Sequence, residues 1–546
     1  MPEKLQIYCE NSDKYVDVSG GETLGEIACR LELGFEPICA LVNNKNEGLH
    51  YPVYSPKSVR YMDRESSYGR RVYVRSLCMM LYCALRRIMP GVELKIEHTL
   101  SRGLFCRLTD TEVTPELLAS IKTEMIAIHK ADLPFEAYEK RTVDVIADFE
   151  REGLRDKVLL LETVGELYTK YYLLDGVADS YYGCLAPTTG LIDRFDLLKY
   201  HDGFILSGLE TDIVPQEKMF QAFTDYVKFN HVAGVSNVGE MNHTVEKGDA
   251  RMLINVSEAL QNQRIARIAD EITRRYEAGG ARIVLVAGPS SSGKTTFTKR
   301  LGIQLMTNLL EPQMISLDDY FVDRERTPLD ENGDYDYESL YALDLDAFEN
   351  DLQALLDGKE VELPYYNFEN GRREYRGNKV KLQGRSILLI EGIHGLNPEL
   401  AAKIEARMKF KVYVSALTTL SIDNHNWVPT TDNRLLRRII RDSAYRGADA
   451  VETIRRWPSV RRGEEKWIFP FQENADAMFN SSLLFELGVL KECGETLLKR
   501  VPQDCPEYAE AYRLRKFLSY FLPIDERYIP STSLIREFIG GSSFTY

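Results

Sequence analysis

The sequence has few of the features that mark secreted, membrane or nucleic-acid-binding proteins. Its nine cysteines are scattered without a C-x-x-C pair, so neither a zinc module nor a disulfide framework is indicated. No apolar run approaches the ~20 residues that span a bilayer, and the N-terminus lacks a signal pattern. A net charge of −15 disfavours a broad surface for nucleic acid or anionic membrane. These absences predict a cytoplasmic protein whose partner is a small molecule.

What is present describes an ordinary globular chain. Hydrophobic residues make up 44% and charged residues 28% of its 546 residues, a length that predicts about two to four domains. The oligomeric state stays open, with a homo-oligomer as one alternative.

A glycine-rich stretch near the middle predicts a nucleotide site. The β-branched run 283–286 predicts a buried strand, and the turn after it matches G-x-x-x-x-G-K-[ST], the pattern of a phosphate-binding loop. Glycines let backbone N–H groups wrap a polyphosphate, and the N-terminus of the following helix adds partial positive charge. The residues predicted to bind ATP are Gly288, Pro289, Ser290, Ser291, Ser292, Gly293, Lys294, Thr295 and Thr296.

Acidic residues at the ends of two predicted buried strands are candidates for the chemistry. Segments 314–321 and 387–391 are apolar runs that reach Asp318-Asp319 and Glu391. Acids at the carboxyl ends of parallel strands lie in the crevice where α/β sheets bind ligands. Asp318 could accept a proton from a substrate hydroxyl or hold a water on Mg²⁺. Glu391, together with Thr295, is the predicted Mg²⁺ site.

Aromatic and arginine-rich segments complete this half. Segments 334–344 and 363–373 mix tyrosines with carboxylates and arginines, which suits a sugar-like or planar ligand but equally suits packing. In the predicted helix 432–442, Arg434, Arg437 and Arg441 share one face. Such guanidinium groups can bind phosphates, and a solvated basic face is the alternative.

The order of these motifs resembles the phosphoribulokinase/uridine kinase family over residues 281–490. The stretches that match are GPSSSGKTT, ISLDDYF, YDYESLYALD, PYYNFENGRR, ILLIEGIHGL and RRIIRDSAYRG. The resemblance implies an α/β P-loop kinase domain, with a parallel sheet flanked by helices, that uses ATP and Mg²⁺. It implies catalytic roles for Asp318, Lys294 and Arg441, and substrate-binding positions at Asp336, Tyr366, Arg373, Arg438 and Arg446.

The departures from that family concern the acceptor more than the phosphates. Gly371 stands where uridine kinases have a histidine facing the pyrimidine, and Ala448 and Arg456 replace two other expected residues. The lid region carries an extra segment, residues 421–431. The resemblance therefore implies transfer from ATP to a hydroxyl of a nucleoside. A sugar or sugar phosphate is the alternative acceptor, because the LDDY motif followed by Asp323-Arg324 resembles the corresponding stretch of phosphoribulokinases.

The front half resembles the front of threonyl-tRNA synthetases. Residues 1–65 look like a β-grasp TGS module, in which Thr23 and Glu26 have the spacing of a helix capping box. Residues 66–230 look like the α+β editing domain, but Arg75 and Met79 stand where that family has its histidine pair. Without those histidines we expect no editing chemistry. A non-enzymatic ATPase that acts on tRNA or the ribosome through its TGS module is the remaining alternative.

The sequence thus predicts five segments. They are the TGS-like module 1–65, the editing-like domain 66–230, a connecting helical segment 231–280, the kinase-like domain 281–490 and a C-terminal helical extension 491–546.

Overall fold

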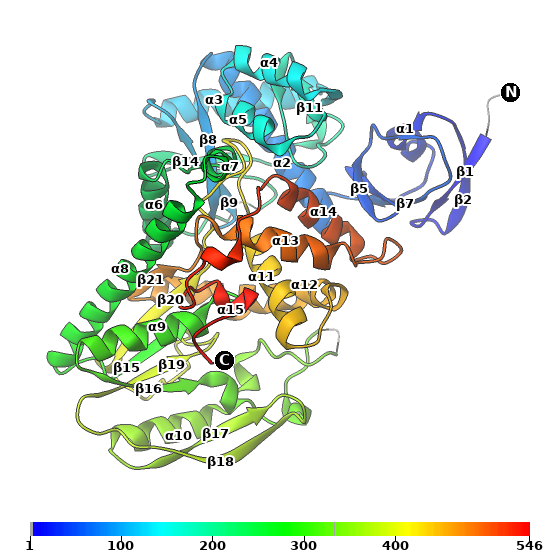
Figure 1. Cartoon of the computed structure of the whole chain (residues 1–546). Coiled ribbons are helices and arrows are strands. Elements are labelled where there is room, and N and C mark those ends of the chain that lie inside the picture. The colour runs from blue at the N-terminus through cyan, green and yellow to red at the C-terminus, as the bar shows by residue number, and fades with distance from the viewer. Residues whose placement is uncertain (1–3, 211, 332, 546) are drawn as a thin grey trace.

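The computed structural model describes residues 4–210, 212–331 and 333–545. Figure 1 shows a small β-rich region at one side, a mixed α/β region at the top and a larger α/β region below, with the C-terminal helices between them. Within the described residues, no helix combines the length and apolar character needed to cross a bilayer.

The N-terminal region is a mixed sheet with a short helix packed on it. The sheet order is β2-β1-β7-β4-β5, and β1 pairs antiparallel with β2 but parallel with β7. Thr23 caps α1 and forms the predicted capping box with Glu26. The elements are β1 (Lys4–Cys9), β2 (Lys14–Ser19), β3 (Glu22–Thr23), α1 (Leu24–Ala28), β4 (Cys39–Val42), β5 (Lys45–Gly48), β6 (Pro52–Val53) and β7 (Ser58–Met62).

The second region packs helices on an antiparallel sheet of order β13-β14-β9-β8, with a smaller sheet β10-β11-β12 beside it. Its longest helix, α2, is almost wholly buried from Val72 to Leu85 because it lies between the sheet and α3. The elements are α2 (Ser67–Ile88), β8 (Leu94–Leu100), β9 (Gly103–Leu108), α3 (Pro115–Ala131), β10 (Glu136–Arg141), α4 (Thr142–Glu152), α5 (Arg155–Val164), β11 (Tyr168–Leu174), β12 (Val177–Asp179), β13 (Asp196–Tyr200) and β14 (Gly203–Ser207).

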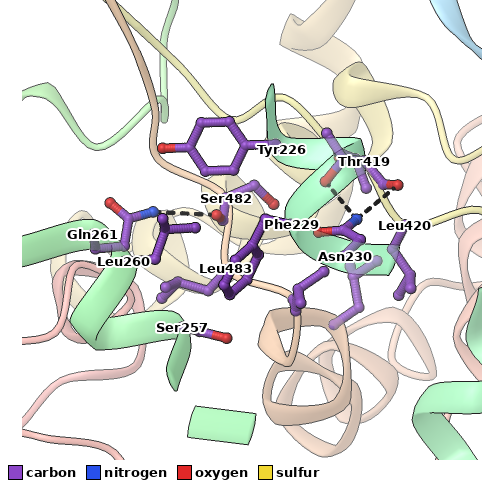
Figure 2. Close-up of a pocket in the computed structure, with 13 residues that line it drawn as sticks. Tyr226, Phe229, Asn230, Ser257, Leu260, Gln261, Thr419, Leu420, Ser482 and Leu483 are labelled. Carbon is purple, nitrogen blue, oxygen red and sulfur yellow. Dashed lines mark hydrogen bonds between the residues drawn. The ribbon is translucent and has the colours of Figure 1, made fainter. Parts of the chain in front are cut away.

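Three helices connect this region to the next: α6 (Glu217–Val232), α7 (Val238–Glu246) and α8 (Ala250–Glu277). The apolar stripe of α8, formed by Ile265, Ile268 and Ile272, packs into the core of the next sheet, as the 3–4 spacing predicts. Figure 2 shows a small cavity where α6 and α8 meet that core. Gln261 Nε2 donates to Ser482 O (3.2 Å) and Asn230 Nδ2 to Thr419 O (3.1 Å), so the cavity is a packing seam with about 20 Å³ of free space.

The third region contains a five-stranded, all-parallel sheet of order β16-β19-β15-β20-β21. All residues of β15 are buried, since helices cover both faces. A hairpin, β17-β18, projects from this region with α10, at the bottom of Figure 1. The elements are β15 (Ile283–Ala287), α9 (Lys294–Thr307), β16 (Glu311–Ser316), α10 (Leu345–Leu356), β17 (Val361–Asn367), β18 (Arg372–Val380), β19 (Ser386–Glu391), β20 (Lys409–Ser415), α11 (Thr430–Tyr445), α12 (Ala450–Trp467), β21 (Ala477–Asn480), α13 (Glu486–Leu498), α14 (Tyr508–Ser519) and α15 (Arg536–Ile539).

The extra segment between β20 and α11 docks on the second region instead of forming part of a lid. The buried ammonium group of Lys157 forms ion pairs with Asp179 Oδ1 (2.8 Å) and Asp423 Oδ1 (3.0 Å). His425 Nδ1 donates to Asp179 Oδ2 (2.8 Å). Lys157 and His425 together hold the pKa of Asp179 well below its usual range, although burial alone would raise it. A buried charge cluster thus joins the two halves.

Replacing Lys157 should test that junction. Lys157→Met leaves two buried carboxylates without their cation, and breaking a buried pair in this way costs about 3–5 kcal/mol. We expect a clearly lower urea midpoint, measured by circular dichroism.

The matched control is Lys122→Met, because Lys122 pairs with Asp196 on the surface. That change should cost no more than about 1 kcal/mol. Equal midpoints for the two variants would contradict the importance of the buried cluster.

Candidate active site

The phosphate-loop sequence sits at the carboxyl end of the central strand β15. A Cβ on Gly288 would lie 1.9 Å from the carbonyl oxygen of Val414, and one on Gly293 would lie 2.4 Å from Leu534 Cδ2. Gly293 also has φ of 82°, which non-glycine residues rarely adopt. The loop can therefore pass between β20 and the C-terminal extension only with glycine at both positions.

The side chains at the start of α9 form hydrogen bonds with the phosphate loop, with the end of β19 and with α15. Lys294 Nζ donates to Pro289 O (3.3 Å), which folds the lysine over the loop. Thr295 Oγ1 donates to Glu391 Oε1 (3.0 Å) at the end of β19. Thr296 Oγ1 donates to Glu537 Oε2 (2.6 Å) on α15. The C-terminal extension therefore contributes directly to the loop, which the motif pattern did not predict.

Thr295 and Glu391 together fit a Mg²⁺ ion. Mg²⁺ takes one or two protein oxygens and completes its octahedron with water and phosphate oxygens, so it needs no larger protein cluster. The described residues contain no group of three or more candidate metal ligands. Burial raises the pKa of Glu391 to about 7, and Lys294 opposes that rise. A bound cation would favour the ionised carboxylate further.

Asp318 and Asp319 lie just past β16, which ends at Ser316. The predicted strand continued to residue 321, but Leu317–Tyr320 form a 3₁₀ turn. The turn separates the two carboxylates. Asp319 Oδ1 accepts a hydrogen bond from Tyr366 N (3.2 Å), so it holds the hairpin strand β17.

The side chain of Asp318 is instead exposed to solvent. Surrounding protein atoms still desolvate its carboxylate enough to raise the pKa, against the opposing charges of Lys294, Arg446 and Arg441. A carboxylate with these cationic neighbours, and with no hydrogen bond from its own side chain to another described residue, can accept a proton from a ligand.

Three of the residues predicted to bind the substrate that accepts the phosphate differ in their surroundings. Tyr366 is buried, with its ring 5.5 Å from Phe321 and 5.0 Å from Phe368 between centroids. Arg373 Nη2 is paired with Asp344 Oδ2 (2.8 Å). Asp336 is partly buried, and its Oδ1 accepts a hydrogen bond from Glu338 N (3.1 Å). Aromatic rings and one partly buried acid therefore lie in this region, while the charge of Arg373 is already balanced.

Arg324 occupies the space beside Gly371. A Cβ on Gly371 would lie 2.7 Å from Arg324 Nε, and Arg324 Nη2 donates to Phe368 O (2.6 Å). The position that departs from uridine kinases is thus filled by a guanidinium group from another segment.

The arginines of α11 do not form one phosphate-binding face. Arg434 and Arg437 are fully buried and pair with Glu464 and Glu486. Their guanidinium groups also donate to the loop carbonyls Ser290 O (2.9 Å, from Arg434) and Ser291 O (3.3 Å, from Arg437). Both expectations for these two residues, phosphate binding and a solvated face, are wrong, because packing against the loop buries them.

The other three arginines are Arg438 and Arg441 in α11 and Arg446 at its C-terminal end. Arg438 Nη1 donates to Ser290 Oγ (3.0 Å). Burial, together with the charge of Arg446, lowers the pKa of Arg441 to about 10. Arg446 is exposed, and all three lie near Asp442. They place positive charge beside the phosphate loop.

Two further acids in the site were not predicted. Ser290 N donates to Glu464 Oε1 (3.2 Å), so a buried carboxylate of α12 binds a backbone amide of the phosphate loop. Burial and the nearby charge of Glu464 raise the pKa of Glu338 to about 7. In the sequence, Glu464 resembles any surface acid three residues from an arginine, Arg461, so no local signal marks it.

The positions at which the resemblance places the editing histidine pair lie on α2. Arg75 and Met79 are buried in α2, where Arg75 Nε donates to the backbone carbonyl of Cys184 (3.2 Å). His98 stacks on Phe223 with ring centroids 3.8 Å apart, and burial lowers its pKa to about 3. His98 is therefore a neutral packing residue.

Comparison with known proteins finds matches to the region that contains the parallel sheet. Residues 283–483 match the profile of the Phosphoribulokinase / Uridine kinase family. The uridine kinase of Staphylococcus aureus strain JH9 is 29% identical over 198 residues, which cover 36% of this chain and 84% of that protein. The C-terminal region therefore carries a P-loop kinase domain of this family, and these matches do not reach the front half.

Solved structures were also matched. A possible uridine kinase from Bacillus stearothermophilus is 18% identical and covers 39% of this chain and 97% of its own, with a TM-score of 0.27. D-glycerate 3-kinase from Cryptococcus neoformans is 15% identical and covers 47% of this chain and 87% of its own, with a TM-score of 0.22.

Removing the loop lysine should abolish phosphate transfer without unfolding the domain. In Lys294→Ala the backbone cradle stays, but the charge that would reach the transferring phosphoryl group is lost. By analogy with the loss of one transition-state donor, we expect turnover to fall by roughly 10²–10³-fold. Lys403→Ala, on the surface, is the control and should turn over normally. Near-normal turnover of Lys294→Ala would refute the assignment of this loop.

Proposed function

We propose that this chain is an ATP-dependent kinase that transfers the γ-phosphoryl group of ATP to a hydroxyl group of a small molecule, with a nucleoside as the first candidate. The observation that carries the proposal is the division of labour between Asp318 and Asp319. One carboxylate is held by a backbone amide of β17, and the other is exposed and interacts with the charge of Lys294. A phosphate loop with an available base beside its lysine is suited to attack by a hydroxyl group on a phosphoryl group.

In this proposal the loop residues 288–296 bind the polyphosphate through backbone N–H groups. Because Ser290 N donates to Glu464, a phosphate oxygen at that amide requires the carboxylate to move away. Lys294, Arg438 and Arg441 stabilise the charge that spreads over the transferring group. Mg²⁺ held by Thr295 and Glu391 would neutralise phosphate charge. Asp318 accepts the proton of the attacking hydroxyl on a carboxylate oxygen.

A nucleoside fits the aromatic lining of the acceptor region. The rings of Tyr366, Phe321 and Phe368 lie together, and the partly buried carboxylate of Asp336 has acceptor capacity left for ribose hydroxyl groups beyond its bond from Glu338 N. The identity to a uridine kinase over the matched region supports the same class of acceptor.

A sugar phosphate is the second candidate, and Arg324 favours it. Its guanidinium group lies against Gly371 in the turn between β17 and β18, in space that a larger side chain at that position would fill. A guanidinium group there could pair with a phosphate that the acceptor already carries.

An acceptor screen tests the function. Purified protein with labelled ATP should phosphorylate at least one compound from a panel of nucleosides, sugars and sugar phosphates. Arg324→Gln should raise the KM by about tenfold or more for a sugar phosphate, because a charge-assisted bond is lost, but should change the KM for a nucleoside little. ATP hydrolysis without transfer to any compound would favour the non-enzymatic ATPase instead.

Replacing each of the two aspartates by asparagine, one at a time, tests which of them is the catalytic base. Asp318→Asn keeps size and hydrogen bonding but cannot take the proton, so kcat should fall by about 10²–10⁴-fold while the Kd for ATP changes little. Asp319→Asn removes the charge but keeps an Oδ1 that can accept from Tyr366 N, so it should cost far less. If Asp319→Asn is inactive and Asp318→Asn is active, the base is misassigned.

A further inference from the structure

A cavity of about 310 Å³ lies outside the kinase domain, where the N-terminal region, the second region and the C-terminal extension meet. Its walls come from β5 and the residues after it, from α2, from β10 and β11, and from α14. Figure 1 shows β5 beside α14, and these two elements are in contact. The size is within the range of sites for small ligands. A smaller cavity of about 130 Å³ shares Lys170 and Lys516 with it.

Tyrosines dominate the walls of this cavity. Eight of its lining residues are tyrosines, contributed by each of the three parts of the chain. Tyr138 and Tyr171 stack with ring centroids 5.7 Å apart, and Tyr182 lies 5.7 Å from the guanidinium carbon of Arg75. Tyrosine combines a flat apolar face with a hydroxyl group, so such walls suit a planar ring with polar edges.

Three cations in the lining have no carboxylate partner within ion-pair distance. Buried Arg75 donates only to the carbonyl of Cys184. The side-chain ammonium groups of Lys170 and Lys516 form no hydrogen bond or ion pair with the described residues. Burial lowers the pKa of Lys516, and the charges of Lys170 and Arg75 act in the same direction. The remaining lining cations, Arg71 and Arg513, are already paired with acids.

Two carboxylates line the cavity beside these three cations. They are Glu47 and Glu139, while Glu166 lies near Lys516 but outside the lining. Burial raises the pKa of Glu47, and the charges of Lys170, Lys45 and Lys516 oppose that rise. An anionic ligand group at the Arg75 and Lys516 end would satisfy the unpaired cations there.

Neutral polar atoms are also unpaired at the cavity. His50 Nε2 and Asn46 Oδ1 are shielded from solvent and make no hydrogen bond to another described residue. Burial lowers the pKa of His50, so its ring is neutral and offers one donor and one acceptor. Groups of this kind can pair with the polar edge of a heterocycle.

We propose that this cavity is a second ligand site that binds a nucleoside monophosphate, with its base among the tyrosines and its phosphate on Arg75, Lys170 and Lys516. The argument uses the cavity alone, so it stands or falls separately from the proposed kinase activity.

Calorimetric titration of the full-length protein tests the site. The probes are uridine and adenosine 5′-monophosphates, uridine, and ribose 5-phosphate, in Mg²⁺-free buffer. Lys516→Gln should weaken binding of the monophosphates by at least about tenfold, since a charge-assisted bond is lost. Arg515→Gln is the matched control, because Arg515 is the neighbouring residue on α14, carries the same charge and does not line the cavity. It should change affinity less than about twofold.

Binding at the phosphate loop is common to all three proteins, so the difference between variants reports on the cavity. Ribose 5-phosphate and uridine should each bind the wild-type protein at least about tenfold more weakly than the monophosphates, because each lacks one half of the recognised chemistry. If Lys516→Gln does not fold, Lys170→Gln takes its place, since Lys170 is exposed and its loss should not disturb packing. Unchanged affinity in both variants, or equal binding of ribose 5-phosphate, would overturn the proposal.

Discussion

The kinase half depends on two buried ion pairs, Arg434 with Glu464 and Arg437 with Glu486. Each arginine is fully buried, so its charge is tolerable only with a carboxylate and further acceptors around it. The additional acceptors are the carbonyl oxygens of Ser290 and Ser291. The helix α11 therefore fixes the phosphate loop through its carbonyl groups, and the same Glu464 accepts from the loop amide of Ser290.

A second set of buried charges attaches the front half to the same helix. Lys157 joins Asp179 of the second region to Asp423, which lies a few residues before α11. On the other side, Arg513 of α14 forms a double hydrogen bond with Asp432 in the first turn of α11. Because removing one member of such a pair exposes an uncompensated buried charge, these contacts hold the regions in one arrangement. The cavity and the phosphate loop thus both border elements that pack on α11.

Much of the kinase half could be predicted because its signals are local. The apolar run 283–286, the glycines of the loop and the helix after them are contiguous, and the backbone adopts the expected strand, turn and helix. Near Asp318 the local signal was incomplete. The strand stops at Ser316 because Ser316 Oγ accepts from Asp318 N (3.3 Å) and starts a 3₁₀ turn, which apolar alternation does not reveal.

The sequence by itself determined the phosphate loop, the acids that follow β16 and β19, and the apolar stripe of α8, since each is written in neighbouring residues. Only the tertiary structure decided which charges face a ligand. Glu464 binds the amide of Ser290 across 174 residues, and Glu537 binds Thr296 across 241. It also buried Arg434 and Arg437 and docked residues 421–427 on the front half. Pairing and burial at such separations depend on how whole elements pack, which no local pattern encodes.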